Sequence, residues 1–159
     1  MVHQPQDLGD VLALHPDAPL AWRAAAVAGA YLRDERPDEL VVDTKSTPTA
    51  AVSARDRGAE QLIVSMVLDA CPDDGFLGEE GGERRGTSGR RWVVDPLDGT
   101  VNYLYRIPLW GVSVALEDGD GTVVGVVVLP DQHVSYVAVR GAGSWSVRGD
   151  VVHRLLGSD

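Results

Sequence analysis

The chain has 159 residues, enough for one domain with a buried core and too few for two ordinary domains. Hydrophobic residues make up 44% and charged residues 24%, a balance that is typical of folded globular proteins and argues against a disordered chain. The 14 Lys and Arg residues stand against 24 Asp and Glu residues, and the net charge of −10 argues against a basic surface for nucleic acid.

The sequence carries no membrane or secretion signal. It has no run of about 18 apolar residues, and its N-terminus lacks a basic region followed by an apolar one. The single Cys71 excludes an intrachain disulfide and ends an apolar helical pattern, which favours a small buried side chain in a reducing compartment. We therefore expect a cytoplasmic protein without a membrane or nucleic-acid partner.

Two helices are predicted in the first half of the chain. Residues 1–19 hold three prolines and scattered Asp, so we expect a loose N-terminal arm, followed by one domain over residues 20–159. The first helix should run from Leu20 until Pro37 stops it, and the second from about Ser53 to Cys71. In each helix the apolar residues recur at three- and four-residue steps and so share one face. They are Leu20, Ala24, Val27, Ala28, Tyr31 and Leu32 in the first helix and Ala59, Leu62, Ile63, Met66, Val67 and Ala70 in the second.

The second half has the pattern of strands. Short strands are expected at 76–78 and 92–94, whereas residues 40–42 are either a short strand or an extended lead into a loop at 43–49. Longer runs rich in β-branched residues follow at 110–116, 123–129 and 134–139, with a hairpin around Gly149 and Asp150. Because the connections are short, neighbouring strands should pair antiparallel as a meander. The expected fold is α+β, with helices packed on a mainly antiparallel sheet in two layers.

The stretch 92–100 concentrates groups that can do chemistry. Residues 92–94 indicate a buried strand, and Pro96 cannot donate a ladder hydrogen bond, so the chain should leave the sheet at Asp95. Asp95 and Asp98 then lie on one turn, where they repel each other unless a cation sits between them. Carboxylate oxygens suit a hard ion such as Mg²⁺. The alternative is that Asp98-Gly99 is only a turn signal.

Other polar residues also fall at the ends of predicted elements. Lys45 and Asp56 lie around the start of the second helix, and Glu79 follows the strand at 76–78. If the two short strands are neighbours, Glu79, Asp95 and Asp98 converge. Taken singly, each has an ordinary explanation: Asp56 suits a helix start, Glu79 and its neighbour a solvated pair, and Lys45 the surface.

Taken together, these residues resemble the inositol monophosphatase family of Mg²⁺-dependent phosphatases. Asp95-Pro96-Leu97-Asp98-Gly99-Thr100 matches the family signature Asp-Pro-[Ile/Leu]-Asp-Gly-Thr at every position. Gly78-Glu79-Glu80 matches its Gly-Glu-Glu, and residues 45–56 match its Lys-Ser-x-Pro and Val-Thr-x-x-Asp segments. The resemblance covers roughly residues 20–147, in family order, and implies the fold of that family's N-terminal lobe for residues 20–159.

The resemblance implies a set of metal ligands. Glu79, Asp95 and the backbone carbonyl of Leu97 would hold one Mg²⁺, and Asp95 with Asp98 would begin a second site. These acids come from the two strand ends that the chain pattern already singles out. The implied cofactor is therefore Mg²⁺.

The resemblance also implies catalytic and phosphate-binding residues. Gly99 and Thr100 would present backbone N–H groups to the substrate phosphate. Asp56 with Thr100 would orient and deprotonate the attacking water, and Lys45 would compensate charge nearby. The reaction would be in-line hydrolysis of a phosphate monoester, so the expected partner is a small phosphorylated substrate.

Several readings of the function stay open. Inositol monophosphate is the expected substrate, with histidinol phosphate or a nucleotide 3′-phosphate as alternatives. A different class of function is a catalytically impaired or inactive remnant that binds Mg²⁺ or a partner chain. The first reading makes the chain a phosphoric monoester hydrolase, and the second makes it a binding protein.

The sequence departs from the family pattern in two ways. Ala50 stands where the family usually has Asp, and Ser53 stands where it has Thr, which keeps a hydroxyl. The sequence is also shorter than family members, and none of its four Trp residues precedes an Asp, whereas a family Trp-Asp segment would complete the second metal site. We therefore expect the C-terminal α/β lobe to be absent, and a homodimer or a complementing C-terminal lobe as partner.

Overall fold

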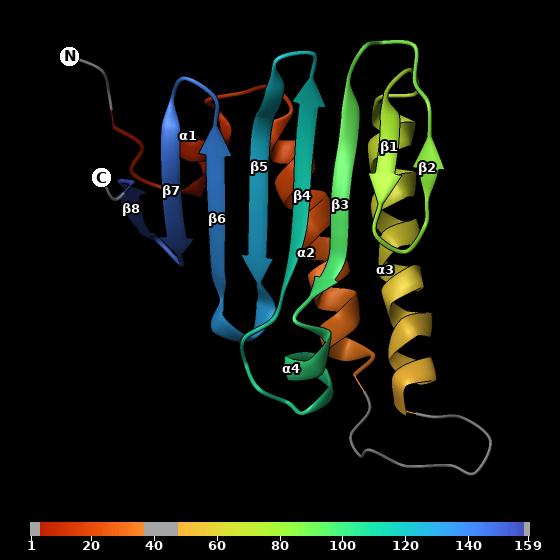
Figure 1. Ribbon diagram of the computed structural model, residues 1–159. Coiled ribbons are helices and arrows are strands. Elements are labelled where there is room, and N and C mark those ends of the chain that lie inside the picture. Colours follow the sequence, from red (N-terminus) through yellow and green to blue (C-terminus); the bar gives the residue numbers. More distant parts are fainter. Residues whose placement is uncertain (1–3, 37–47, 158–159) are drawn as a thin grey trace.

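The computed structural model describes residues 4–36 and 48–157 of the chain. Eight strands of this part form one sheet in the order β2-β1-β3-β4-β5-β6-β7-β8 (Figure 1). β1 is parallel to β3, and all other neighbours are antiparallel, which confirms the predicted meander and the α+β fold. The strands are β1 (Gly75–Gly78), β2 (Glu83–Arg84), β3 (Arg91–Asp98), β4 (Gly111–Asp118), β5 (Gly121–Leu129), β6 (Val134–Val139), β7 (Gly143–Arg148) and β8 (Val151–Leu155).

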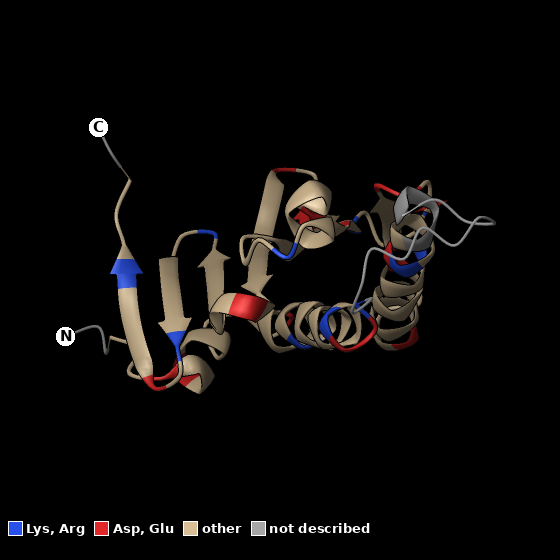
Figure 2. Ribbon diagram, turned by 90° about the horizontal axis from the view of Figure 1, so that it is seen from below, with Lys and Arg blue, Asp and Glu red and all other residues tan. Residues whose placement is uncertain are grey.

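The two long helices lie side by side on one face of the sheet (Figures 1 and 2). α2 packs on the middle strands β4 and β5, and α3 packs on β3. Figure 1 looks onto the opposite face of the sheet. The helices are α1 (Leu8–Leu12), α2 (Ala18–Asp34), α3 (Pro48–Ala70) and α4 (Thr100–Leu104), and the 3₁₀ turn η1 (Pro130–Gln132) joins β5 to β6.

Helix α2 meets the sheet with small side chains. Five alanines of α2 and Gly29 are buried, and a Cβ added at Gly29 would lie only 2.7 Å from Pro130 Cγ. Val112 Cγ2 of β4 would lie 3.7 Å from the same Cβ, so the helix lies close to η1 and to β4. Val27, expected on the apolar face, is 40% exposed, because the buried stripe runs instead through the alanines and Leu32.

Helix α3 begins at Pro48, earlier than the predicted Ser53. A proline is tolerated in the first turn, where its missing N–H has no intrahelical partner, so the Pro48 that suggested a loop is compatible with a helix start. Two acids lie on its buried stripe. That stripe consists of Val52, Asp56, Ala59, Glu60, Ile63 and Val67.

Part of the N-terminal arm, residues 8–12, forms the helix α1. α1 starts with a cap in which the backbone N–H of Asp10 donates to Asp7 Oδ1 at 2.9 Å. Val11 is fully buried and Leu12 nearly so, and both belong to the hydrophobic core. The apolar pair holds residues 8–12 against the domain, while the domain boundary at residue 20 stays a prediction.

Strand β3 does not end at Asp95, as its sequence predicts, but continues to Asp98. Asp95 pairs with Ser113 and Asp98 with Gly111, so three steps on β3 face two on β4. This register shift is a β-bulge, and it accommodates Pro96, which cannot donate to the ladder. Both carboxylates nevertheless lie at the end of the strand.

The core fills the space between the helices and the sheet. Its largest fully buried side chains include Trp92, Tyr103, Leu32 and Ile63. Within the described ranges, none of the helices combines the length and the hydrophobicity that crossing a bilayer requires. The strand considered at 40–42 and the candidate Lys45 lie outside the described residues.

Candidate active site

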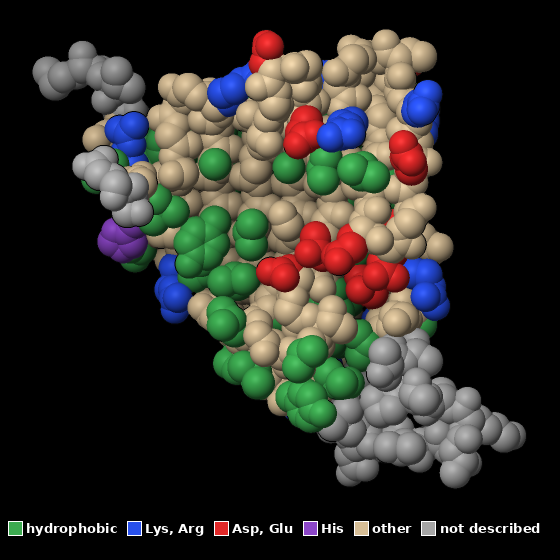
Figure 3. Space-filling view, in the orientation of Figure 1, with side chains coloured by type: hydrophobic (Ala, Val, Ile, Leu, Met, Phe, Trp, Pro, Cys, Tyr) green, Lys and Arg blue, Asp and Glu red, His purple; other side chains and the backbone are tan. Residues whose placement is uncertain are grey.

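The parallel pairing of β1 and β3 brings the two acidic motifs together. Gly78 is the register partner of Val94, and the backbone N–H of Glu79 donates to the Val94 carbonyl at 3.1 Å. Glu79 and Asp95 are the residues that come directly after this pair, so they lie next to each other, Glu79 just past the end of β1 and Asp95 on β3. Figure 3 shows acidic side chains gathered in front of the end of β3, next to hydrophobic side chains over α4.

Asp56 reaches this group from α3. It is only 7% exposed, and its Oδ1 is buried without a hydrogen-bond partner. Burial, followed by the charge and hydrogen bond of Glu80 and the charges of Asp95 and Glu79, raises the pKa of Asp56 to about 7. A buried carboxylate among other carboxylates resists ionisation, because burial disfavours its charged form and the neighbouring negative charges repel it.

Asp95 has the same kind of surroundings. Burial raises its pKa to about 7, together with the hydrogen bond and charge of Glu79 and the charge of Asp98. The opposing contribution is the backbone N–H of Leu97, which donates to Asp95 Oδ1 at 3.2 Å. Asp56, Glu79, Asp95 and Asp98 are thus within electrostatic reach of one another.

The remaining motif residues form the turn into α4. Gly99 caps the helix with φ 81° and ψ 39°, a left-handed conformation that glycine adopts without strain. A Cβ there would also lie 3.0 Å from the Leu109 carbonyl oxygen, so the position has no room for a side chain. The Thr100 hydroxyl donates to the Leu97 carbonyl at 3.2 Å, which joins the proposed phosphate-binding residue to a proposed metal ligand.

A network that the sequence analysis missed ties α4 to the rest of the domain. Arg36 donates from Nε to the Tyr103 carbonyl and from Nη1 to Asp131 Oδ2, each at 2.9 Å. Its guanidinium also lies 4.9 Å from the Tyr103 ring centroid, a cation–π contact. Trp110 Nε1 donates to the same Asp131 oxygen at 2.6 Å. These contacts fix the short helix whose first residue is Thr100.

Glu60 is a second residue that the sequence analysis missed. It is 7% exposed and accepts the backbone N–H groups of Glu80 and Gly82, at 2.9 and 3.2 Å. A sequence signal for it exists, because Asp56 and Glu60 are four residues apart and so project from the same side of α3. That spacing places two acids within an otherwise apolar stripe.

The described residues do not form a ready-made metal cage. Within residues 4–36 and 48–157, no three His, Cys, Asp or Glu side chains are grouped as a metal-binding set. The carboxylates are close enough to perturb one another, but the metal roles of Glu79, Asp95, Leu97 and Asp98 stay a prediction. Lys45 lies outside the described residues, so its expected place near the site is not tested.

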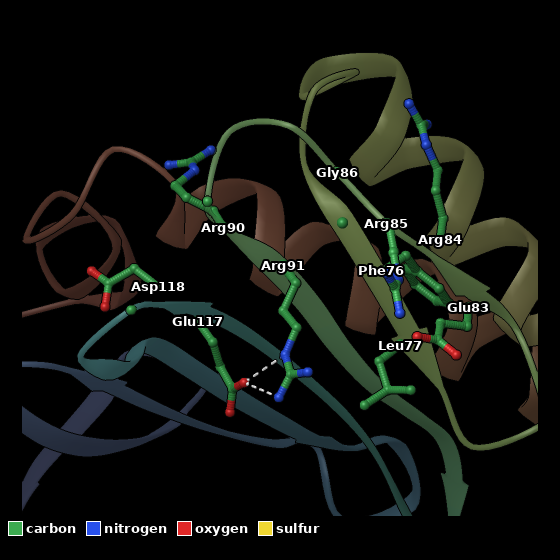
Figure 4. A pocket seen from close by; sticks show the side chains of 13 residues that line it. Phe76, Leu77, Glu83, Arg84, Arg85, Gly86, Arg90, Arg91, Glu117 and Asp118 are labelled. Atoms are coloured by element: carbon green, nitrogen blue, oxygen red, sulfur yellow. Dashed lines mark hydrogen bonds and ion pairs between the residues drawn. The ribbon is translucent and has the colours of Figure 1, made fainter.

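A separate pocket of about 530 Å³ lies at the other end of β3 and contains four arginines (Figure 4). Most of these cations are already engaged. Arg91 pairs with Glu117 at 2.9 Å, Arg90 with Asp74 at 2.8 Å, and Arg84 donates to the Pro72 carbonyl. Because carboxylates also line this pocket, its charges are largely balanced, and it is a weaker candidate for a phosphate than the end of β3.

The motif order and the fold both point to one group of known proteins. A model of the inositol monophosphatase family matches residues 13–154 of the chain. The chain belongs to this family. An inositol-1-monophosphatase of Rhizobium meliloti (strain 1021) is 50% identical over 100 residues, which cover 62% of this chain and 37% of the relative.

Two further proteins extend the comparison. A histidinol-phosphatase of Chlorobaculum parvum is 38% identical over 133 residues, covering 82% of this chain and 50% of the relative. The crystal structure of the extragenic suppressor protein suhB from Bartonella henselae matches with a TM-score of 0.71 and 36% identity, covering 82% of this chain and 51% of the other. The chain spans about half the length of the curated relatives it matches.

Proposed function

We propose that this chain supplies the metal- and phosphate-binding side of an active site that hydrolyses a phosphate monoester with Mg²⁺, with inositol monophosphate as substrate. The observation that carries the proposal is the meeting of Asp56, Glu79 and Asp95 at the end of β3, within the family motif, with one buried Asp56 oxygen unpartnered. Family membership and a relative named inositol-1-monophosphatase support the reaction class.

The acidic group is suited to a divalent cation. Glu79, Asp95, Asp98 and the Leu97 carbonyl would hold Mg²⁺, which prefers oxygen ligands. The raised pKa values of Asp56 and Asp95 reflect burial and repulsion that a bound dication would offset. When bound, Mg²⁺ would polarise the phosphate oxygens and lower the pKa of the attacking water.

The chain's own residues would position the water and the phosphate. Asp56 would accept a proton from the water, since its buried Oδ1 has no other partner. The Thr100 hydroxyl donates to Leu97, so its oxygen can still accept a hydrogen bond from the same water. Gly99 and Thr100 would donate backbone N–H groups to the phosphate, and Lys45 would add positive charge nearby. These last roles rest on the family resemblance.

Phosphate release from myo-inositol 1-phosphate tests the proposal. The purified chain should release phosphate in proportion to Mg²⁺ occupancy, and Asp95→Asn should lower the rate by at least about 100-fold, because it removes a charged oxygen from the metal site. Glu117→Gln, at the far end of the sheet, should retain the rate. No release above the blank at any Mg²⁺ concentration would refute phosphatase activity for this chain alone.

The alternative function is binding without turnover. Histidinol phosphate and a nucleotide 3′-phosphate belong in the same assay, because one relative is named histidinol-phosphatase. If Mg²⁺ binds and none of the three substrates is hydrolysed, the chain acts as a binding protein or requires a homodimer or a complementing lobe. The chain spans only 37% and 50% of the length of these two relatives, which is the reason to test binding as well as hydrolysis.

A further inference from the structure

Glu60 places two hydrogen-bond acceptors under the turn that carries the acidic motif. The turn runs from Gly78 to Gly82 and is closed by the Gly78 N–H, which donates to the Gly82 carbonyl at 2.7 Å. Inside it, Glu60 Oε2 accepts from the Glu80 N–H at 2.9 Å and Oε1 accepts from the Gly82 N–H at 3.2 Å. Both oxygens of one buried carboxylate are thus used by the backbone of this turn.

The glycines at the two ends of the turn fit around this carboxylate. A Cβ added at Gly78 would lie 2.2 Å from Glu60 Oε2, and one at Gly82 would lie 2.5 Å from Oε1. Neither glycine has a positive φ, so neither is required for a left-handed conformation. Gly81, between them, has φ 97° and nothing within 4 Å of its added Cβ. The ends of the turn are therefore glycine because of their approach to Glu60.

We propose that Glu60 is a positioning residue, which fixes the backbone of the 78–82 turn so that Glu79 and Glu80 face Asp95 and Asp56. Glu60 lies one helical turn after Asp56 on α3, so a single helix both supplies a side chain to the acidic group and holds the loop that carries its partners. It acts through backbone N–H groups and does not itself bind the cation. The inference rests on the proposed function for its cation, and on the two hydrogen bonds of Glu60 for its geometry.

The first test compares amide hydrogen exchange in Glu60→Gln and in the wild-type chain. Gln keeps the volume but can accept with one oxygen only, so exchange at Glu80 and Gly82 should accelerate by about 10-fold or more. Amides of β5 should keep their wild-type rates, which excludes general unfolding. Glu83→Gln is the matched control, because it removes the same charge from an exposed residue of β2. Unchanged exchange at Glu80 and Gly82 would overturn the inference.

The second test measures Mn²⁺ affinity by counting free Mn²⁺ with electron paramagnetic resonance, without substrate. In Glu60→Gln the dissociation constant should rise by about 10–100-fold, as is typical when a residue supporting metal ligands is removed. Glu83→Gln should change it by less than about 2-fold. Weaker Mn²⁺ binding with unchanged exchange would make Glu60 a ligand and overturn its positioning role.

Gly82→Ala probes the same contact from the other side. Its added Cβ should push the Glu60 carboxylate away and so weaken Mn²⁺ binding with Glu60 intact. Since both changes break one contact, the double variant should bind about as well as either single variant. Additive losses would count against the shared contact.

A wild-type chain that binds no Mn²⁺ would refute the proposed function, while the exchange experiment would still decide whether Glu60 holds the turn.

Discussion

Asp56 is an unfavourable residue for the stability of the metal-free domain. A carboxylate that is 7% exposed, with one oxygen lacking a hydrogen bond, is a rare and destabilising arrangement. Its pKa is raised to about 7, so ionising Asp56 near neutral pH lowers the stability of the folded state. A bound cation would offset the cost of burying this carboxylate, whereas packing alone gives no reason for an acid at this position.

Asp56→Asn should therefore raise the thermal midpoint of the metal-free chain at pH 8 by about 2–4 °C. Because the pKa of Asp56 in the native state lies above its ordinary value of 3.8, the native state binds more protons than the unfolded state between about pH 4 and pH 7, and wild-type stability falls as pH rises through this window. The variant with the uncharged Asn does not lose stability in this way, so the difference in thermal midpoint between variant and wild type should be small at pH 4. Circular dichroism melts in a chelator measure both values.

Asp118→Asn is the control for Asp56→Asn, because it removes a carboxylate whose pKa is lowered in the folded state. Hydrogen bonds from Arg140 lower the pKa of Asp118 to about 2, so its charge is favourable in the folded state. That variant should not raise the midpoint at pH 8. A midpoint for Asp56→Asn at or below the wild-type value would contradict the assigned repulsion.

The acidic residues of the candidate site can be predicted from the sequence, but the residues that hold them in place cannot. Asp95, Asp98 and Glu79 are recognisable because they follow apolar strands and match a motif. Glu60 and Arg36 are not, because a charged residue in a helix is usually exposed and only the tertiary structure shows what it holds. The four-residue spacing from Asp56 is the one local signal that singles out Glu60.

At the scale of elements, Asp74 lies between α3 and β1 and binds the loop before β3 and β3 itself. It is 2% exposed and accepts from Arg90 Nη2 at 2.8 Å, from Ser88 Oγ at 2.7 Å and from Trp92 Nε1 at 3.0 Å. Burial raises the pKa of Asp74, but the hydrogen bonds from these three residues outweigh it, and the net shift is downward. The carboxylate therefore stabilises the start of the strand whose other end carries the site.

Asp74→Asn should lower the free energy of unfolding at pH 7 by about 3 kcal/mol. The change leaves Ser88 and Trp92 with an uncharged partner and leaves the part-buried Arg90 with Asp17 as its remaining carboxylate. The lowered pKa means that the contribution is present above about pH 4 and is lost as pH falls below that value, so the difference from wild type should shrink in acid. Urea unfolding at several pH values measures it. Glu117→Gln, which breaks the exposed pair with Arg91, should change stability by less than about 1 kcal/mol. Equal effects of the two substitutions would refute the role of Asp74.

Element types follow from the sequence better than element limits do. The meander is predictable because each strand is a β-branched run between turn residues, and the two long helices follow from their apolar spacing. The start of α3 and the end of β3 are mispredicted at Pro48 and Pro96, where local rules for proline compete with tertiary context. A helix start and a β-bulge each accommodate a residue that lacks an N–H donor.

At the scale of the whole molecule, the sheet separates structural and chemical roles. One face packs against α2 and α3, and this is where the apolar periodicity of both helices is used. The acids gather at the end of β3, although the chain already carries a net charge of −10. Concentrating like charges in one place destabilises the folded state, and a bound dication is the simplest physical compensation.

The folded chain should therefore be stabilised by Mg²⁺ through mass action. A ligand that binds only the native state at about 100 times its dissociation constant adds about 2.7 kcal/mol, which corresponds to a rise in thermal midpoint of about 5–10 °C for a chain of this size. Asp95→Asn should abolish most of this rise, because it removes a carboxylate from the centre of the acidic group. KCl at the same ionic strength is the control, since it screens the net charge without occupying the site. An equal rise with KCl, or an undiminished rise in Asp95→Asn, would assign the effect to general screening and remove the cation from the end of β3.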